Sequence, residues 1–288
     1  MKHLSILFAA LFFQNLPPAS GQSDSDINHL LWEISGNGLG KPSYLYGTVH
    51  MICEKDFFMK DPLKEKFSGA DKLYLEVDMD DPTLNMKMLQ HAMLQNKKLS
   101  DFFTPEDYAR LNDFFRDSIK MPLTMLSTMK PFTLFSLMLM KALPCDKQKS
   151  YELTFVEMAK EQSKEVLGLE TIEDQMKVFD DMPDSVQAQM VMRYVDEFSS
   201  QRDEFNKLVE NYKNQDLDAL YQGILASPDM AGAQDVLLFN RNRRWIPVIS
   251  EAIKKEPVFI AVGAGHLPGE QGVIRLLQKE GYTVVPVK

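Results

Sequence analysis

Short apolar runs of strand length occur at both ends of the chain, and longer stretches with a helical period lie between them. Residues 30–35 (LLWEIS) and 43–49 (SYLYGTV) are two such runs, and the Gly-Asn-Gly at 36–38 between them is typical of a turn. Residues 73–77 and 165–169 have the same apolar character. We expect a strand in each of the four runs and a hairpin from the first two.

The C-terminal segment has the clearest pattern. A predicted strand at 258–262 is followed by a glycine-rich turn, a helix at 269–280 and a last strand at 283–287. Helical periodicity also covers 150–163 and 232–254. The chain therefore alternates between strands and helices at its C-terminal end.

Two long stretches, about 81–145 and 171–230, are helical throughout. Prolines such as Pro105, Pro131 and Pro183 divide them into short helices. Strands that alternate with helices predict an α/β fold with a central mixed or parallel sheet. That sheet would be built from the N- and C-terminal halves, and the two stretches would be large helical insertions that form a cap.

The first residues have the pattern of a signal peptide, which predicts that 1–21 are removed. A lysine precedes an apolar run at 4–13, and two prolines lead to small residues before the expected cleavage after Gly21. A buried helix or a membrane anchor is the alternative, but the run is shorter than the ~20 residues that span a bilayer. We expect an exported protein, periplasmic or extracellular, with one domain at 22–288.

Composition and charge narrow the range of partners. The 288 residues include 41 acidic and 32 basic ones, a net charge of -9, so no domain-wide positive field exists and nucleic acid is not an expected partner. Hydrophobic residues make up 44%, enough for a sizeable core. The longest later apolar stretch, 131–143, has the length of a buried helix, so we expect no membrane span in the mature chain.

A Gly-x-x-His motif occurs twice, each time at the end of a predicted strand. It runs from Gly47 to His50 and from Gly263 to His266, with Gly265 inside the second copy. In open α/β sheets, ligands bind in the crevice at the carboxyl ends of the strands. Glycine lets the backbone approach a ligand closely. The pattern predicts that both histidines belong to one site.

Two other predicted strands end in carboxylates, Glu76 and Glu170. Two carboxylates with two neutral imidazoles would balance a divalent cation, and this mixture suits zinc, manganese or cobalt better than calcium. Each residue also has an ordinary alternative, such as a surface histidine, a solvated strand edge or a helix cap. Their joint occurrence at strand ends favours a metal or acid–base site.

A dinucleotide site is a competing interpretation of the second motif. Gly263 and Gly265 follow a predicted strand and precede a predicted helix, as that fingerprint requires. However, Pro268 stands at the third glycine position, and no acidic residue ends the next predicted strand. The nucleotide interpretation therefore fails.

These segments resemble the TraB/GumN family, which also includes the animal Tiki proteases. The resemblance is carried by YGTVHM at 46–51, LEVD at 75–78, GLET at 168–171 and AVGAGHL at 261–267, and it covers about 30–287. It implies an α/β domain related to the EreA/ChaN-like folds. It also implies a metal-dependent hydrolase, with peptide-bond cleavage in the Tiki branch.

The resemblance implies a role for each matching residue. His50 and His266 would be metal ligands or direct catalytic groups, and Glu76 and Glu170 would be a ligand and a general base in an order that the sequence does not assign. Arg241 would steady an oxyanion or orient a carboxylate with its fixed planar fork. A surface arginine in a basic run is the alternative for Arg241.

The two cysteines are close to this set along the chain. Cys53 follows His50 by three residues, and Cys145 precedes the predicted helix that contains Glu152. In an oxidising compartment the pair is most simply a disulfide that ties the His50 loop to the cap, with two unpaired buried thiols as the alternative. Glu152 stands where many relatives have aspartate, so its role is open.

The sequence thus predicts a secreted or periplasmic metal-dependent hydrolase with a peptide or small-molecule substrate. Among hydrolases, a peptidase is the favoured class. The alternative is a non-catalytic protein that binds a peptide or small ligand in the same cleft.

Overall fold

A central six-stranded sheet organises the computed structural model, which describes residues 28–228 and 233–288. In spatial order the strands are β6 (Glu165–Gly168), β4 (Lys72–Leu75), β7 (Val258–Gly263), β2 (Ser43–Thr48), β1 (Leu31–Ser35) and β8 (Thr283–Pro286). The first four are parallel neighbours, while β1 is antiparallel to both β2 and β8. This confirms the predicted α/β fold with a mixed sheet drawn from both halves of the chain.

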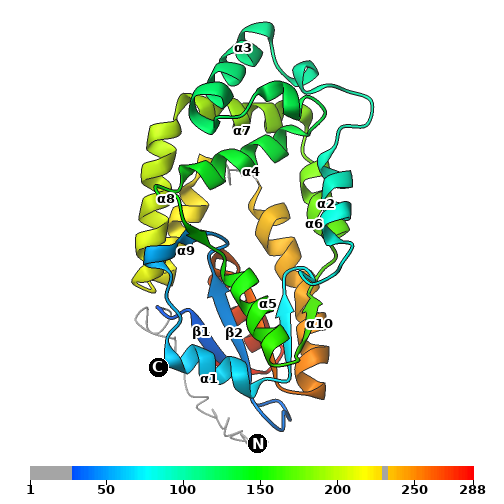
Figure 1. The fold of residues 1–288 in the computed structure, drawn as a ribbon. Helices are drawn as coiled ribbons and strands as arrows, with labels where there is room; N and C mark the ends of the chain where they lie inside the picture. Colours follow the sequence, from blue (N-terminus) through cyan, green and yellow to red (C-terminus); the bar gives the residue numbers. More distant parts are fainter. Residues whose placement is uncertain (1–27, 229–232) are drawn as a thin grey trace, which may run out of the picture.

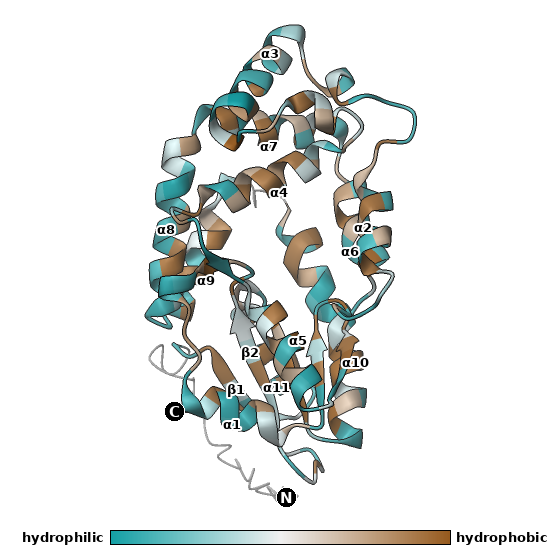
Figure 2. Ribbon diagram, in the orientation of Figure 1, coloured by the Kyte–Doolittle hydropathy of each residue, from teal (hydrophilic) through white to brown (hydrophobic). Residues whose placement is uncertain are grey.

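Helices cover the sheet and bury its apolar strands. In Figure 1, α1 (Asp61–Gly69) and α5 (Tyr151–Glu161) lie in front of the sheet. Phe67 of α1 stacks on Phe155 of α5 with ring centroids 5.4 Å apart, and both rings contact Phe259 of β7. α10 (Asn240–Lys255) packs against α11 (Val273–Lys279), which lies behind the sheet. Figure 2 shows apolar residues along the strands and on the helices that cover them.

The two predicted insertions form a helical cap above the carboxyl ends of the parallel strands (Figure 1). Its helices are α2 (Leu84–Ala92), α3 (Pro105–Phe114), α4 (Pro131–Ala142), α6 (Ile172–Asp180), α7 (Asp184–Asp196), α8 (Phe198–Lys213) and α9 (Leu217–Ala226). Part of the cap has its own apolar cluster, which includes Leu134, Met138 and Val191. Tyr212 of α8 connects the cap to the sheet, because its hydroxyl donates to the carbonyl of Gly47 in β2 at 3.1 Å.

Several boundaries differ from the expected ones. The helix expected at 232–254 is a π-helical turn, Asp235–Phe239, followed by α10, which continues through Pro247 to Lys255. The helix expected at 269–280 begins only at Val273. Gly269 has a φ of +85°, a left-handed conformation that cannot start a right-handed helix.

The N-terminal segment and the lengths of the helices bear on the predictions of a signal peptide and of no membrane span. The predicted signal peptide, 1–21, lies outside the described residues. None of the helices within 28–228 and 233–288 is long and apolar enough to cross a membrane. The apolar stretch at 131–143 forms the short helix α4, as its length predicts.

A small two-stranded ribbon joins the loop after β2 to the segment before α5. Its strands are β3 (Ile52–Cys53) and β5 (Gln148–Lys149), which the sequence analysis did not predict because each has only two residues. The structure links Cys53 to Cys145 through a disulfide with a Cα–Cα distance of 5.9 Å. The ribbon and the disulfide therefore tie the His50 loop to the end of the first insertion.

Removing this bridge should destabilise the fold measurably. The two cysteines are 92 residues apart, so the bridge constrains a long loop of the unfolded chain. We expect the Cys53→Ser/Cys145→Ser double variant to lose about 2–4 kcal/mol in the free energy of unfolding, measured by urea titration. The reduced wild-type protein is the matched comparison and should lose a similar amount. Equal stability of the oxidised wild type and the double variant would contradict this expectation.

Candidate functional site

The carboxyl ends of the four parallel strands meet at one edge of the sheet, directly below the cap. Glu170 follows β6, Glu76 follows β4, His266 lies just after β7 and His50 follows β2. Because these strands are parallel neighbours in the order β6-β4-β7-β2, the four side chains extend from a continuous edge. The two distant Gly-x-x-His motifs are adjacent in space, since β2 and β7 pair directly.

Arg241 of α10 binds both carboxylates. Its Nη2 donates to Glu76 Oε2 at 2.6 Å and to Glu170 Oε1 at 2.5 Å, and its Nε donates to Glu170 Oε1 at 2.8 Å. The three side chains are only 10%, 9% and 3% exposed for Arg241, Glu76 and Glu170. Arg243 and Arg244, by contrast, are exposed on the same helix.

The charge of Arg241 decides the protonation of Glu76. Burial alone would raise the pKa of Glu76, but Arg241, followed by the two histidines and the Gly263 backbone N–H, holds this pKa well below its usual range. Gly263 N donates to Glu76 Oε1 at 2.8 Å, so the two carboxylate oxygens face different partners. Glu76 is therefore an anion at neutral pH.

His266 is buried and held in one tautomer. Asn242 donates its side-chain N–H groups to the carbonyls of Gln271 and His266, so its oxygen is left to accept from His266 Nδ1 at 2.6 Å. Burial lowers the pKa of His266 to about 3, against the opposing effect of Glu76. The neutral ring therefore has its lone pair on Nε2, which lies 3.3 Å from Arg241 Nη1 and 3.8 Å from Glu76 Oε1.

His50 has a different environment. Its Nδ1 lies 2.9 Å from Glu152 Oε1, which also accepts from the Thr48 hydroxyl at 2.6 Å. Burial acts to lower the pKa of His50, but the hydrogen bond and charge of Glu152 outweigh it and raise this pKa to about 9. Solvent reaches 68% of the His50 side chain and therefore screens its interaction with Glu152.

The motif glycines allow this close arrangement. A Cβ on Gly263 would lie 3.3 Å from Glu76 Oε1, 3.6 Å from the His266 ring and 3.8 Å from His50 Nε2. Gly263 thus leaves open a small space that all three side chains border. A Cβ on Gly47 would lie 3.1 Å from the backbone of Ala264, which links the two motifs, and one on Gly265 would collide with Ile224.

The donor set around this space has the chemistry of a transition-metal site. Both histidines engage Nδ1 with an oxygen and leave Nε2 directed elsewhere, the pattern of metal-binding histidines with an outer partner. Two imidazoles and the carboxylate of Glu76 suit zinc, manganese or cobalt. In the described part of the chain, however, no three His, Cys, Asp or Glu side chains are arranged to hold a metal ion as they stand. Glu170 in particular is drawn to Arg241 rather than to the histidines.

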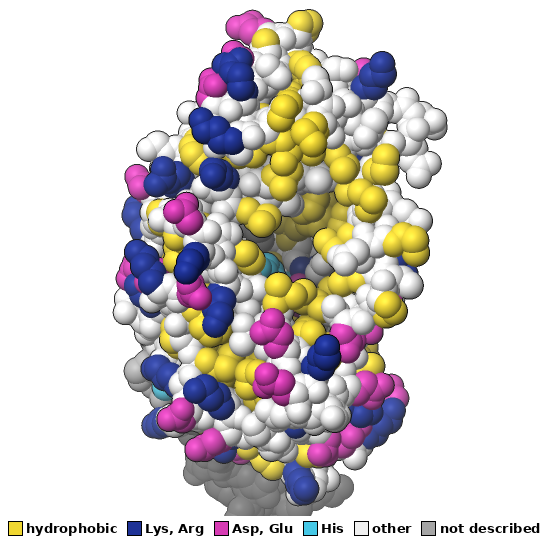
Figure 3. Space-filling view, viewed as in Figure 1, with side chains coloured by type: hydrophobic (Ala, Val, Ile, Leu, Met, Phe, Trp, Pro, Cys, Tyr) yellow, Lys and Arg dark blue, Asp and Glu magenta, His cyan; other side chains and the backbone are white. Residues whose placement is uncertain are grey.

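The site lies in a hollow between the sheet and the cap. Figure 3 shows this hollow in the middle of the molecule, with a histidine visible inside it and hydrophobic side chains around its rim. On this face of the molecule, charged side chains lie mainly outside the hollow (Figure 3). The exposed hydrophobic residues include Met86 and Leu89 of α2, Met140 of α4 and Leu153 of α5. A ligand entering the hollow would therefore meet an apolar rim before it reached the charged site.

Sequence reasoning missed the partners of the two histidines. The sequence assigns no role to Glu152 or to Asn242. Gln175 of α6 was also missed, although its side chain donates to Glu76 at 3.1 Å. No local spacing marks these contacts, because each joins segments that are far apart along the chain.

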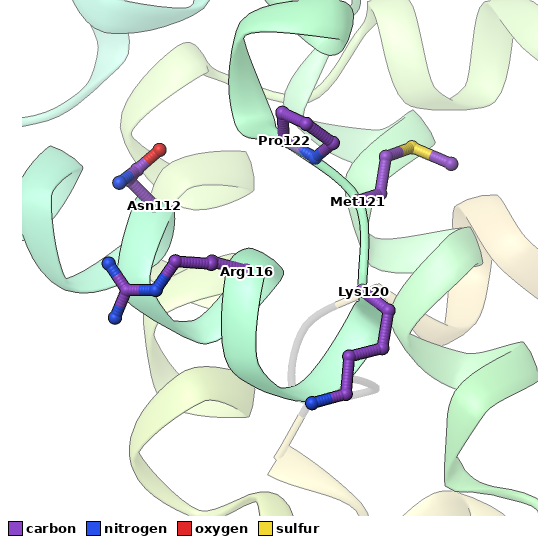
Figure 4. Close-up of a pocket in the computed structure, with 5 residues that line it drawn as sticks. All are labelled: Asn112, Arg116, Lys120, Met121 and Pro122. Carbon is purple, nitrogen blue, oxygen red and sulfur yellow. The ribbon is translucent and has the colours of Figure 1, made fainter.

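A second pocket, of about 410 Å³, lies in the cap and is separate from the strand ends. Figure 4 shows its lining, which comes from α3 and the segment that follows it: Asn112, Arg116, Lys120, Met121 and Pro122. Asp113 and Asp117 already pair with the Arg116 guanidinium. We therefore assign no ligand to this pocket.

Comparison with known proteins identifies relatives of this chain. Residues 30–286 match the model of the TraB/PrgY/gumN family. Metalloprotease TIKI2 of Danio rerio is 21% identical over 91% of this chain and 61% of its own length. Metalloprotease TIKI1 of Danio rerio is 23% identical, over 90% of this chain and 63% of its own. Metalloprotease TIKI1 of Homo sapiens is 22% identical, over 90% of this chain and 62% of its own length.

The chain spans less than two thirds of the length of these relatives. No solved structure gives a significant match. The family match nevertheless covers the whole sheet up to Pro286 and both Gly-x-x-His motifs. This chain is a member of the TraB/PrgY/gumN family.

Proposed function

We propose that the chain is a metal-dependent hydrolase that cleaves peptide bonds. The observation that carries the proposal is the meeting of His50, Glu76, Glu170 and His266 at one sheet edge, with Arg241 between the carboxylates. The names of the TIKI relatives, which describe metalloproteases, support the same class of reaction. The apolar rim of the hollow suits a peptide or a small molecule of similar character.

His50, His266 and Glu76 would hold a divalent cation, of which zinc, manganese and cobalt fit the donors best. When bound, such a cation supplies an acidified water and polarises the substrate carbonyl. Glu76 is the better candidate ligand of the two carboxylates, since its Oε1 borders the same space as the histidines. Glu170 is then the candidate general base.

The chain's own residues prepare this site. Arg241 keeps Glu76 ionised and holds both carboxylates in place, and its Nη1 lies 3.3 Å from His266 Nε2. A guanidinium in this position can also donate to an oxygen that becomes negative during the reaction. Asn242 holds His266 so that its Nε2 faces the site rather than the protein interior.

A second candidate function is binding without turnover. The observation that favours it is the tight pairing of Arg241 with both carboxylates, which offsets one of their two negative charges without a metal ion. In this case the hollow would capture a peptide or small ligand and release it unchanged.

A cleavage assay separates the two functions. The untagged protein, supplied with zinc, manganese or cobalt, is incubated with a broad peptide library, and the products are analysed by mass spectrometry. A hydrolase should cleave a subset of peptides, lose the activity with a chelator and regain it when the metal is restored. Binding of peptides with no cleavage under any of the three metals would refute the hydrolase and favour the second function.

Export is a separate proposal that rests on the sequence of the first 21 residues. We infer that the mature protein begins at Gln22 and resides in the periplasm or outside the cell. N-terminal sequencing of the protein purified from its native source should find Gln22 first. An intact N-terminus on the purified protein would count against export by this route.

A further inference from the structure

Glu152 is a buried carboxylate whose presence the fold alone does not explain. Its side chain is 9% exposed and lies in the first turn of α5. Its oxygens accept from the hydroxyls of Thr48 and Ser150 and from His50 Nδ1, at 2.6, 2.9 and 2.9 Å. A carboxylate is costly to bury unless it is well bonded, so these three donors are needed to keep it there.

Helix capping does not account for this residue. The N-cap of α5 is Ser150, whose hydroxyl already accepts from Leu153 N. An acidic residue in the first turn also stabilises a helix through the helix dipole, but an exposed one would serve equally well. The inward direction of Glu152, toward the end of β2, therefore calls for another reason.

The chain is built so that Glu152 meets His50. β3 follows His50 and pairs with β5, which ends directly before Ser150 and α5. The disulfide between Cys53 and Cys145 joins the same two segments. The ribbon and the bridge thus bring the start of α5 to the His50 loop, although the two residues are far apart in sequence.

We propose that Glu152 is a positioning residue that accepts a hydrogen bond from His50 Nδ1 and thereby directs His50 Nε2 into the space beside Gly263. In the structure, Nε2 lies 3.8 Å from the position that a Cβ on Gly263 would occupy, next to Glu76 Oε1 and the His266 ring. The catalytic consequence rests on the proposed hydrolase function, but the positioning itself does not.

The other histidine shows why His50 depends on such a partner. His266 is 6% exposed, packs against Trp245 with ring centroids 4.5 Å apart and planes tilted by 41°, and is held by Asn242. The His50 side chain is 68% exposed, and within the described residues its bond to Glu152 is its single hydrogen bond. Packing therefore orients His266, while the orientation of His50 depends on Glu152.

The test follows the imidazole of His50 by NMR in the metal-free protein. In the wild type we expect a strongly downfield Nδ1–H resonance, assigned by its loss in His50→Ala, because the acceptor is a carboxylate. Glu152→Gln should shift this resonance upfield, and Glu152→Asp, which keeps the charge, should restore part of the shift. Glu157→Gln makes the same charge change at an exposed position of α5 and should leave the resonance in place.

Activity provides the second readout. If the protein is the proposed hydrolase, Glu152→Gln should lower kcat/KM by ~10–100-fold, the usual cost of losing an outer partner of a metal-binding histidine. Glu152→Asp should recover part of the loss, which a purely structural role would not predict.

The outcomes keep the two proposals apart. An unchanged His50 resonance in folded Glu152→Gln overturns the positioning role, whatever the activity. If Glu152→Gln does not fold, the wild type decides the question, and the absence of a strongly downfield Nδ1–H resonance that is lost in His50→Ala then overturns the role. A shifted resonance in a protein that cleaves no peptide upholds the positioning role and refutes only the proposed hydrolase.

Discussion

Replacing Arg241 with methionine is expected to lower the free energy of unfolding by about 3–5 kcal/mol, the usual cost of removing one partner from a buried ion pair. Methionine matches much of the volume of arginine but leaves Glu76 and Glu170 without their shared cation. The two carboxylates, 9% and 3% exposed, would then repel each other in a poorly solvated position. Urea unfolding of the metal-free protein measures the loss.

The pH dependence of this variant follows from the same charges. In the wild type, Arg241 holds the pKa of Glu76 low, so the pair stabilises the fold above the unfolded pKa of ~4.3 and loses this effect only in strong acid. Without Arg241 the pKa of one carboxylate should rise above its unfolded value. Protonation then relieves the repulsion, so Arg241→Met should lose less stability at pH 5 than at pH 7.5.

Arg243→Met is the matched control for this prediction. Arg243 lies on the same helix, but its side chain is 47% exposed and its ion pair with Asp235 spans 3.9 Å. Exposed pairs contribute little to stability, so we expect a change of less than about 1 kcal/mol. Equal effects of the two substitutions would show that Arg241 does not hold the buried carboxylates together.

The second large effect concerns the two histidines. Replacing either one should abolish most of the activity, but the two replacements should differ in their effect on stability. In the proposed hydrolase, His50→Ala and His266→Ala should each lower kcat/KM by more than the ~100-fold that loss of an outer partner costs, because each removes a direct ligand. His266→Ala should also destabilise the protein, since it empties a buried position against Trp245. His50→Ala should change stability much less, because its side chain is largely exposed.

His91→Ala is the control for the histidine pair. His91 lies in the last turn of α2, a helix of the cap, and its replacement should leave both activity and stability close to those of the wild type. If His50→Ala and His266→Ala retain the activity of His91→Ala, the histidines are not catalytic ligands. Peptide cleavage rates and urea unfolding curves on the same three preparations provide the comparison.

The sheet was largely predictable because its strands carry their own signal. All six predicted strands agree with the structure to within two residues at each end. The strand ends also predicted which residues would lie together, because parallel neighbours must deliver their carboxyl ends to one edge. His50, Glu76, Glu170 and His266 therefore fall together without any contact having been predicted.

The remaining features depend on tertiary contacts. The burial of Arg241 follows from the position of α10 against the strand ends, and nothing in the run of basic residues distinguishes it from Arg243. Glu152 meets His50 only because β3 and β5 pair, and strands of two residues leave almost no sequence pattern. Asn242 likewise gains its role from the approach of His266.

In the proposed hydrolase, His50, His266 and Glu76 hold one divalent cation. The most direct test measures metal bound to dialysed, untagged protein after addition of zinc, manganese or cobalt, for the wild type and for His50→Ala, His266→Ala and Glu76→Gln. We predict one ion per chain in the wild type for at least one metal, with strongly weakened binding in all three variants. A wild type that binds none of the three metals, or variants that bind as the wild type does, would contradict the claim.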